Sequence, residues 1–558
     1  MNNDYLSEYN RWLIKCDVDV DSKKQLLSLS SEEIEDAFYK ELSFGTAGMR
    51  GIIGLGTNRM NKYTIRKANY GYGKFLKDKY KENISIVIAR DNRFKSDEFM
   101  EECIKVLSTF NIKCYIFEDI TPTPILSFAI RNLNANGGIV ITASHNSKEY
   151  NGYKIYDENG CQLIPEYANK VIDNMKECPD YFDIQFNDLN YCKEKKLYEY
   201  VPDYVIDNYM RMLLSIPIND SISKENFKII FSSLHGTTGK FANNILKKLN
   251  YKFKIVEEQL IPDPNFSTVC YPNPEDINAL SMSIEYAKKY NADVCFATDP
   301  DGDRIGIAVK NNKNEYILLN GNQIGIIIFD YLCKNKDING SYIIDTIVSS
   351  RIIDKIAKKH NINHLSTYTG FKFIGSQIDN LLKNNKKFIF GFEESYGYLL
   401  NENVRDKDAL QALVILSEIA CKYKSDNLSL IDVLDKIYLE YGYFKEQLIS
   451  ITLDGSNGLE KINEIMDYFR NYKKQKIGNF EIINKIDYYN NDLIVNGINL
   501  GKSNILEFNF DNSYVIFRPS GTEPKIKAYI GSCSIDKDNC IYIFNKLNCV
   551  ITEIIKNI

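Results

Sequence analysis

Three aspartates that alternate with other residues in one short loop carry the clearest chemical signal: Asp299, Asp301 and Asp303. An extended turn would direct all three carboxylates at one centre, and Gly302 permits the tight backbone path that this requires. Hard oxygen ligands of this kind suit Mg²⁺, which keeps other coordination positions for water or a phosphate oxygen. A calcium EF-hand does not fit, because its twelfth position would be Lys310 instead of a bidentate glutamate. A solvated acidic turn is the alternative.

A second stretch offers a nucleophile at the end of a predicted strand. The run 139–141 is apolar and β-branched, and it is followed by Ser144 and His145, a hydroxyl and a possible proton carrier. Lys154 adds a cation after a turn signal at 151–152. In open α/β sheets ligand chemistry gathers at the carboxyl ends of strands, which places Ser144 where a reacting group is expected. An ordinary strand-to-loop turn that contains a serine fits the same residues.

Other polar loops supply parts that would complement a metal and a nucleophile. The glycine-rich segment 45–51 would let the backbone approach a ligand closely, and Arg50 within it could offer a planar fork to a phosphate. Glu393 and Ser395 could bind sugar hydroxyls, and the loop 518–525 combines cations, hydroxyls and free amides into an anion cradle. Together these loops indicate phosphoryl transfer, with a cation that neutralises a phosphate on the serine.

The elements that must position these loops are strands that alternate with helices. Helical patterns cover the chain up to about residue 40 and residues 96–110. Predicted strands lie at 84–89, 114–117, 139–141, 227–231, 292–297, 342–344 and 388–390. The alternation predicts parallel α/β layers in three similar units, and the last hundred residues read as an α+β domain. The expected domains are 1–205, 206–322, 323–440 and 441–558.

Composition is ordinary for a soluble globular protein and argues against nucleic-acid-binding and membrane-spanning classes. Its 558 residues are 44% hydrophobic and 26% charged, and a net charge of −5 gives no basic footprint for nucleic acid. Thirteen cysteines without a CxxC pair suggest reduced thiols in the cytoplasm. The sequence contains no run of about 18 apolar residues, so it predicts no membrane-spanning helix. We expect no nucleic-acid or membrane partner.

The polar loops resemble those of the α-D-phosphohexomutase superfamily, in the same order along nearly the whole chain. The segments that carry the resemblance are 45–51, 142–146, 299–304, 391–397 and 518–524. Segments 35–44 and 369–374 resemble the phosphoglucomutase-2/phosphopentomutase branch. Phe371 stands where the bacterial phosphomannomutase/phosphoglucomutase branch commonly has a histidine, which favours glucose or pentose phosphates.

The resemblance implies three similar mixed α/β domains and a C-terminal α+β domain around a central cleft. It implies a phosphate on Ser144 and one Mg²⁺ per chain, held by that phosphate and the three aspartates. Arg50, His145 and Lys154 match positions near the reacting oxygens, with Lys154 the best candidate for the general base. A lysine has an ordinary pKa of about 10.4, so neighbouring cations must depress it. Substrate binding is expected at Arg304, Thr369, Gly370, Lys372, Glu393, Ser395, Arg518, Ser520, Gly521 and Thr522.

The expected activity is a mutase that interconverts glucose 1-phosphate and glucose 6-phosphate through a bisphosphate intermediate, with a sugar bisphosphate as activator. Ribose and deoxyribose phosphates are further candidate substrates. Phosphomannomutase and sugar-bisphosphate synthase remain alternatives within the family. A phosphatase would have little use for loop 391–397, expected to bind the sugar, or for loop 518–524, expected to bind the phosphate that does not react. A non-catalytic phosphosugar sensor would not need Ser144 and all three aspartates. The expected partners are small sugar phosphates, for a monomer or small homo-oligomer.

Overall fold

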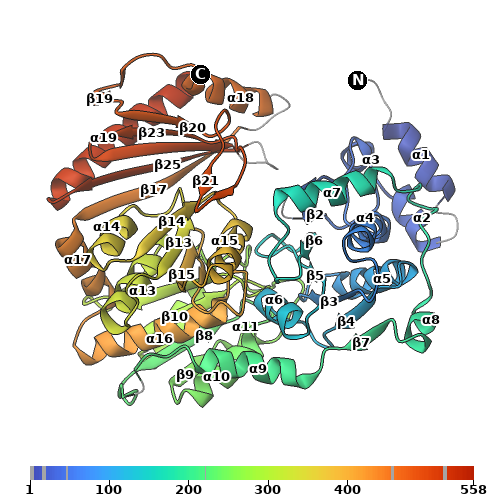
Figure 1. Cartoon of the computed structure of the whole chain (residues 1–558), viewed down its shortest axis with the longest axis horizontal. Coiled ribbons are helices and arrows are strands. Elements are labelled where there is room, and N and C mark those ends of the chain that lie inside the picture. Colours follow the sequence, from blue (N-terminus) through green and yellow to red (C-terminus); the bar gives the residue numbers. More distant parts are fainter. Residues whose placement is uncertain (1–4, 16–19, 46–47, 220, 454–457, 520–524) are drawn as a thin grey trace. The chain divides into compact units, whose positions relative to one another are not determined.

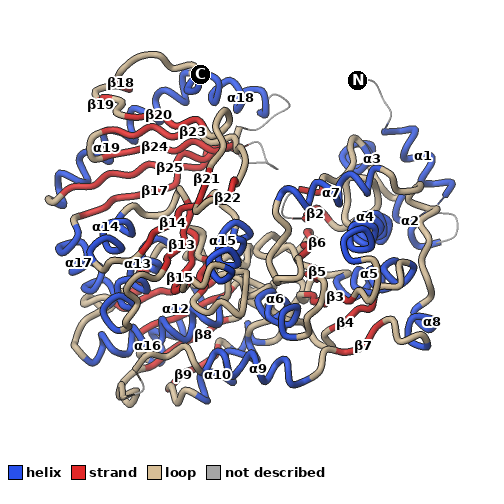
Figure 2. Tube along the Cα trace, viewed as in Figure 1, coloured by secondary structure: helices blue, strands red, loops and turns tan. Residues whose placement is uncertain are grey.

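The computed structural model describes residues 5–15, 20–45, 48–219, 221–453, 458–519 and 525–558, apart from the side chain of Leu459. Contacts divide the chain into two units. The first unit comprises residues 1–320, 378–380 and 395–426, and the second comprises 321–377, 381–394 and 427–558. Figures 1 and 2 show sheets flanked by helices within each unit.

The first unit begins with helices that pack around one buried tryptophan. Helices α1 (Tyr5–Lys15), α2 (Val20–Leu27) and α3 (Ser31–Phe38) enclose Trp12 together with Phe38 and Tyr63. Ser30 caps α3 by accepting a hydrogen bond from the amide of Glu33, whose carboxylate accepts one from the Ser30 amide. These residues serve packing, since apolar side chains at helical spacing form the contact surface.

A seven-stranded sheet follows, in the order β1-β2-β6-β5-β3-β4-β7. Strands β3, β4, β5 and β7 run parallel, whereas β6 is antiparallel to both β5 and β2. The strands are β1 (Phe44–Gly45), β2 (Gly48–Ile52), β3 (Ser85–Arg90), β4 (Lys113–Ile116), β5 (Gly137–Ile141), β6 (Tyr150–Tyr156) and β7 (Tyr198–Tyr200). The helices are α4 (Lys62–Tyr80), α5 (Ser96–Thr109), α6 (Thr123–Asn132), α7 (Pro165–Lys176), α8 (Leu189–Glu194) and α9 (Asp203–Leu214).

Helices cover this sheet on both faces, which explains its apolar central strands. Ile86 and Ile88 of β3 belong to the core that also contains residues of α4 and α5. Val87 alternates with them and is equally buried, on the side where α6 contacts β3 and β5. Strands with both faces covered read as continuous apolar runs, and this is the pattern that predicted β3 and β5 from the sequence.

The second layer of the first unit is a five-stranded sheet in the order β12-β11-β10-β8-β9. Its strands are β8 (Lys228–Ser232), β9 (Lys252–Ile255), β10 (Val294–Thr298), β11 (Ile305–Lys310) and β12 (Tyr316–Leu318). Helices α10 (Gly239–Lys248), α11 (Glu257–Leu260) and α12 (Ser281–Tyr290) belong to it, and β16 (Gly397–Leu399) and α16 (Ala409–Ser425) also lie in the first unit.

The second unit holds a third α/β layer and a C-terminal domain. The layer contains β13 (Tyr342–Thr346), β14 (Asn363–Thr367), β15 (Phe388–Glu393), α13 (Gly321–Asn335), α14 (Ile352–Lys359), α15 (Phe371–Lys383) and α17 (Leu430–Tyr441). Its strands have the order β15-β13-β14, which repeats β5-β3-β4 and β10-β8-β9, and each of these triplets is parallel. The predicted repeat of three similar α/β units is therefore present.

The C-terminal domain is built on an antiparallel sheet in the order β17-β25-β24-β23-β20. Its elements are β17 (Tyr443–Thr452), β18 (Lys476–Ile477), β19 (Phe480–Glu481), β20 (Asn484–Asp487), β21 (Ile494–Val495), β22 (Ile498–Asn499), β23 (Leu506–Phe510), β24 (Ser513–Pro519), β25 (Lys525–Ser534), α18 (Gly458–Arg470) and α19 (Lys537–Asn557). Apolar residues of α18 and α19 share one core with the sheet. The α/β fold class with a C-terminal α+β domain is confirmed.

The sequence interpretation was wrong at one turn. Asn151-Gly152 reads as a turn signal but lies inside β6, where Gly152 pairs with Arg50 of β2. A Cβ on Gly152 would lie 2.4 Å from the carbonyl oxygen of Thr142. Close strand packing, not a turn, therefore requires this glycine.

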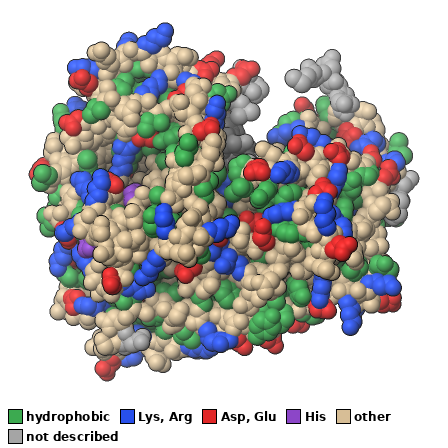
Figure 3. Space-filling model, in the orientation of Figure 1, with side chains coloured by type: hydrophobic (Ala, Val, Ile, Leu, Met, Phe, Trp, Pro, Cys, Tyr) green, Lys and Arg blue, Asp and Glu red, His purple; other side chains and the backbone are tan. Residues whose placement is uncertain are grey.

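Surface charge, cysteines and helix hydrophobicity are the structural features that relate to the composition. Figure 3 shows basic and acidic side chains interspersed over the visible face. Every cysteine in the described ranges is a free thiol. Within the same ranges, no helix is both long and apolar enough to cross a bilayer.

Candidate active site

Ser144 lies just beyond the carboxyl end of β5, in a backbone conformation that few serines adopt. Its φ is +52°, in the left-handed region, and its side chain is buried. The Ser144 amide donates a 2.8 Å hydrogen bond to Oγ1 of Thr142. The Ser144 Oγ donates a 2.7 Å hydrogen bond to Oδ2 of Asp299 and lies 3.3 Å from Nδ1 of His145. The predicted nucleophile thus faces the first aspartate of the acidic loop.

The three predicted aspartates converge in the turn between β10 and β11. One carboxylate oxygen from each of Asp299, Asp301 and Asp303 lies within 4.8 Å of the other two, and all three residues are buried. Gly302 makes the turn possible, because its φ is +69° and a Cβ there would lie 2.5 Å from Cγ2 of Thr238. This is the tight path expected from the sequence.

The donor set of this acidic cluster fits a hard divalent cation. Within the described residues, Oδ1 of Asp301 and Oδ1 of Asp303 are buried without a hydrogen-bond partner. Buried carboxylate oxygens without a partner are costly, and a bound cation would satisfy them. Burial and the neighbouring charge of Asp301 raise the pKa of Asp299 well above its usual range. Such a cation would lower it again.

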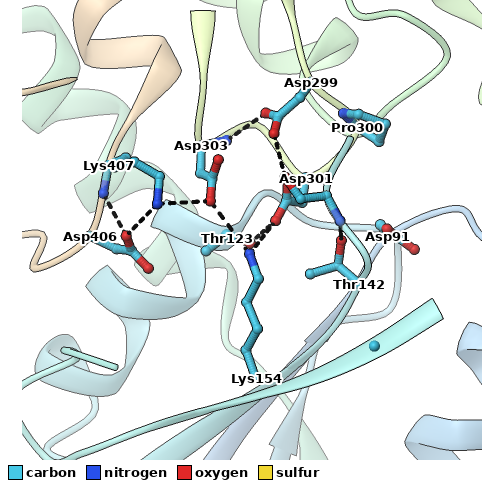
Figure 4. A network of polar contacts seen from close by, with 12 residues as sticks. Asp91, Thr123, Thr142, Lys154, Asp299, Pro300, Asp301, Asp303, Asp406 and Lys407 are labelled. Carbon is cyan, nitrogen blue, oxygen red and sulfur yellow. Dashed lines mark hydrogen bonds and ion pairs between the residues drawn. The ribbon is translucent and has the colours of Figure 1, made fainter. Parts of the chain in front are cut away.

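Two lysines approach the cluster from different elements (Figure 4). Nζ of Lys154, on β6, lies 2.8 Å from Oδ2 of Asp301 and 3.4 Å from Oδ2 of Asp303. Nζ of Lys407, between β16 and α16, lies 3.3 Å from Oδ2 of Asp303 and equally far from Oδ1 of Asp406. Although burial opposes ionisation, Lys407 and Lys154 hold the pKa of Asp303 far below its usual value.

The electrostatics of Lys154 differ from the expectation for a general base. Burial lowers the pKa of Lys154, but the carboxylates of Asp301 and Asp303 outweigh it, and the pKa is raised. The sequence interpretation required a depressed value, so the direction is opposite in this arrangement. A cation that bound the same oxygens would weaken both ion pairs and move the pKa downward.

The other residues expected near the reacting oxygens lie around the serine. Nη1 of Arg50, on β2, donates a 2.7 Å hydrogen bond to Oδ1 of Asn146. Burial, followed by the charges of Arg304 and Arg50, holds the pKa of His145 well below its usual range. Nε of Arg304 lies 3.8 Å from Oδ1 of Asp303, and its Nη1 pairs with Glu275.

The glycine-rich segment at β1 and β2 packs against protein. A Cβ on Gly48 would lie 2.0 Å from the carbonyl oxygen of Tyr153, and one on Gly51 would lie 2.8 Å from Cδ1 of Leu42. For Gly48 and Gly51 the expectation that they serve a ligand's approach is corrected, because they allow β2 to pack against β6 and against the segment before β1. For Gly45 it stays a prediction. Arg50 keeps an exposed side chain on this strand.

The predicted sugar loop of the second unit brings two of its residues together. The amide of Gly370 donates a 2.6 Å hydrogen bond to Oε1 of Glu393, and the φ of Gly370 is +116°. Thr369 precedes this glycine, and Lys372 is buried in the first turn of α15. Burial and the adjacent charge of Glu393 raise the pKa of Glu394 to about 7.

For the remaining predicted substrate residues, the structure gives only a strand position or a unit, and three of them lie outside the described ranges. Arg518 lies near the end of β24, opposite Lys527 of β25. Ser520, Gly521 and Thr522 lie outside the described residues. Ser395 belongs to the first unit.

Sequence reasoning missed several residues that support the site. Oγ1 of Thr123, in the first turn of α6, donates a 3.0 Å hydrogen bond to Oδ2 of Asp301. Arg93 follows the carboxyl end of β3, the kind of position where ligand chemistry gathers in open α/β sheets, and it binds the Ser144 loop. This position could have identified Arg93. Nothing local in the sequence points Lys407 toward Asp303.

Family comparisons agree with the three α/β layers. The models described as phosphoglucomutase/phosphomannomutase α/β/α domains I, II and III match residues 41–181, 207–313 and 320–441. Among named proteins, a phosphoglucomutase of Staphylococcus aureus is 38% identical over 531 residues, which cover 94% of each chain.

Solved structures support the fold. An open form of pp63/parafusin, a phosphoglucomutase from Paramecium, aligns with a TM-score of 0.70 and 19% identity over 93% of this chain and 96% of its own. A phosphoglucomutase/phosphomannomutase family protein from Burkholderia thailandensis aligns with a TM-score of 0.66 and 18% identity over 91% of this chain and 97% of its own.

Proposed function

Because the chain belongs to the phosphoglucomutase/phosphomannomutase family, we propose that it is a phosphosugar mutase that interconverts glucose 1-phosphate and glucose 6-phosphate. The superfamily expected from the polar loops is thereby confirmed, whereas the phosphopentomutase branch stays a prediction. One observation carries the proposal: the Ser144 hydroxyl lies 2.7 Å from a carboxylate of a buried three-aspartate cluster. A hydroxyl beside a cation site is what phosphoryl transfer through a phosphoserine requires.

In this proposal Asp299, Asp301 and Asp303 hold Mg²⁺ together with a phosphate oxygen on Ser144. When bound, the ion supplies charge neutralisation and polarisation of the phosphoryl group. The chain's own residues fix the geometry, because the turn at Gly302 and the hydrogen bond from Thr123 hold the carboxylates in place.

In the proposed reaction a phosphoryl group moves from Ser144 to the sugar, and no further reactant is needed. The bond between phosphorus and Oγ of Ser144 breaks, and a bond forms between phosphorus and the free sugar hydroxyl oxygen. The hydroxyl proton passes to Lys154, our candidate general base, which lies among the carboxylates of the cluster. The leaving Oγ of Ser144 gains one proton in the same step, so that the serine hydroxyl is restored and protons balance. The resulting sugar bisphosphate turns around and returns its other phosphoryl group to Ser144, so that no net phosphate is consumed. Arg50 and His145 would assist around the same oxygens.

Substrate recognition is proposed for residues with matching chemistry. Glu393 would accept hydrogen bonds from sugar hydroxyls, and the amide of Gly370 already orients its carboxylate. Arg518, Ser520, Gly521 and Thr522 would bind the phosphate that does not react. Arg304, Thr369, Lys372 and Ser395 complete the proposed substrate set. We further propose a cytoplasmic protein that acts on small sugar phosphates, as a monomer or small homo-oligomer, with a sugar bisphosphate as activator.

A coupled assay of the purified protein tests the proposal. Glucose 1-phosphate, mannose 1-phosphate and ribose 1-phosphate are offered with Mg²⁺, with and without catalytic glucose 1,6-bisphosphate. The proposal predicts the highest kcat/KM for glucose 1-phosphate and a lag that the bisphosphate shortens. Release of inorganic phosphate at the rate of substrate loss would indicate a phosphatase, and substrate binding without any turnover would indicate a sensor.

A further inference from the structure

Arg93 lies directly behind the serine loop and is wholly buried. It follows β3, and the exposed fraction of its side chain is 0%. Nη2 donates 2.6 Å hydrogen bonds to the carbonyl oxygens of Ser144 and Asn146. Nη1 donates to the carbonyl oxygens of Ser147 at 2.7 Å and of Tyr150 at 3.0 Å. One guanidinium group therefore binds three carbonyl groups of the loop that follows β5 and one at the first residue of β6.

That loop needs an external clamp. It connects β5 to β6, and Ser144 at its start has a φ of +52°. A non-glycine residue in the left-handed region is strained and persists only where surrounding contacts determine its conformation. The hydrogen bond from Nη2 of Arg93 ends on the carbonyl of this strained residue. The orientation of Oγ toward Asp299 is set by the same backbone.

Arg93 is itself fixed by partners on its other side. Its Nε lies 3.2 Å from Oδ2 of Asp91, whose side chain is also wholly buried. Its guanidinium carbon lies 5.0 Å from the ring centroid of Phe266, which comes from the second layer. Phe266 lies within a turn in which Asp263 accepts backbone hydrogen bonds from residues 265–267. The clamp thus links the serine loop to the layer that carries the aspartate cluster.

We infer that Arg93 is a positioning residue for phosphoryl transfer at Ser144, an inference that rests on the proposed mutase function. Arg93 touches neither Oγ nor the aspartate cluster through any described hydrogen bond, so it acts by holding the loop backbone. Its fork of donors suits four carbonyl acceptors in fixed directions, whereas a lysine ammonium is a point charge with three donors. A displacement of a reacting group by about 1 Å can cost on the order of 10²-fold in rate.

The test compares Arg93→Lys with Arg66→Lys. Arg66 forms a largely buried ion pair with Glu102 and lies over the ring of Phe186, but it belongs to α4 and has no described bond to the serine loop. We measure kcat, KM for glucose 1-phosphate, melting temperature, and the rate at which glucose 1,6-bisphosphate loads phosphate onto Ser144, followed by intact mass.

For Arg93→Lys we expect kcat and the loading rate to fall about ten- to a hundredfold, while KM stays within about twofold of the wild type. For Arg66→Lys we expect a comparable change in melting temperature with kcat within about twofold. Equal kcat per folded molecule in both variants would overturn the inference and leave a purely structural role. A wild-type protein that neither loads nor turns over would instead overturn the proposed function, and the inference with it.

A second variant decides the matter if Arg93→Lys does not fold. Phe266→Leu keeps the guanidinium group and removes the ring against which it stacks. We expect kcat and the loading rate to fall about three- to tenfold at unchanged KM, since a loosened clamp misplaces the nucleophile and leaves substrate binding intact. Unchanged kcat and loading in a folded Phe266→Leu protein would contradict the inference.

Discussion

Ser144 and Asp299 lie 155 positions apart in the chain and come from different layers, yet a 2.7 Å hydrogen bond joins Oγ of the serine to Oδ2 of the aspartate. Each follows the carboxyl end of a central parallel strand, β5 or β10. These two strands hold the same place in the repeated strand order of the layers. The predicted nucleophile and the predicted metal loop therefore form one centre within the first unit.

The turn at Gly302 should be essential for the acidic cluster. Gly302→Ala adds a Cβ 2.5 Å from Thr238 at a φ of +69°, so strain and a clash act together. We expect at least a tenfold weaker apparent affinity for Mg²⁺ in activity titrations. Gly340→Ala is the matched control, because its φ of +71° imposes similar strain while no atom lies within 4 Å of the new Cβ. Equal Mg²⁺ affinity in both variants would show that metal binding does not depend on the turn at Gly302.

Removal of one carboxylate charge should weaken the metal site and spare the fold. Asp301→Asn keeps the size of a side chain whose Oδ1 has no hydrogen-bond partner in the described chain. We expect a higher Mg²⁺ concentration for half-maximal activity in a protein that still folds, because relief of the repulsion from the neighbouring aspartates offsets the lost ion pair with Lys154. Asp173→Asn, at an exposed ion pair, serves as the control. Wild-type activity of Asp301→Asn at limiting Mg²⁺ would contradict the assignment.

The sequence predicted those parts of the site that local pattern determines. The turn could be predicted from the spacing of Asp299, Asp301 and Asp303 and from the glycine between the last two. The strand before Ser144 could be predicted from its apolar run. Lys407 could not be predicted, because it reaches Asp303 only through the path from β16 to α16. The glycine pattern around Arg50 was misread, since close packing of backbone on backbone and close approach of a ligand require the same residue type.

The antiparallel strand β6 shows a second limit. Asn151-Gly152 has turn chemistry, but the pairing of β6 with β5 and β2 overrides that local preference. Long-range strand pairing is not encoded in a window of a few residues. The three central parallel strands of each layer could be predicted, because a strand that is buried on both faces is a continuous run of apolar residues.

Arg518 should affect substrate binding more than chemistry. Arg518→Ala removes a charged donor proposed to bind the phosphate that does not react, and loss of such a hydrogen bond is worth about 1.5–3 kcal/mol. We expect KM for glucose 1-phosphate to rise roughly ten- to a hundredfold with a smaller change in kcat. Lys476→Ala, an exposed cation in the same domain, should change neither constant. An unchanged kcat/KM for Arg518→Ala would place the arginine outside the site.

His364 should make the stability of the second unit depend on pH. Burial by itself lowers the pKa of His364, but the Asp345 carboxylate 2.9 Å from Nε2 outweighs it, and the pKa rises from 6.5 to about 10. A raised pKa stabilises the fold fully below pH 6.5, and this contribution is lost as pH rises through about 10. Between these values we expect the free energy of unfolding to fall by about 1.4 kcal/mol per pH unit from this group.

Denaturant unfolding of the wild type and His364→Asn at pH 6, 8 and 10 measures this contribution. The difference in free energy of unfolding between the two proteins should shrink as pH rises. A difference that stays constant across the three pH values would show that folding does not change the pKa of the histidine, and would contradict this prediction.

Phosphate on Ser144 is the central claim, and mass spectrometry of the purified protein tests it most directly. We expect intact mass and peptide mapping, after incubation with glucose 1,6-bisphosphate and Mg²⁺, to place one added phosphate on Ser144. A phosphoserine adds about −1.5 to −2 charge, which the cation and Arg50 would balance. On addition of glucose 1-phosphate, the phosphoryl group on Ser144 should pass to the sugar at a rate no slower than kcat. Ser144→Ala should accept no phosphate and lose nearly all turnover while still binding substrate. A Ser144→Ala protein that keeps most of its turnover with the bisphosphate present would contradict the phosphoserine mechanism.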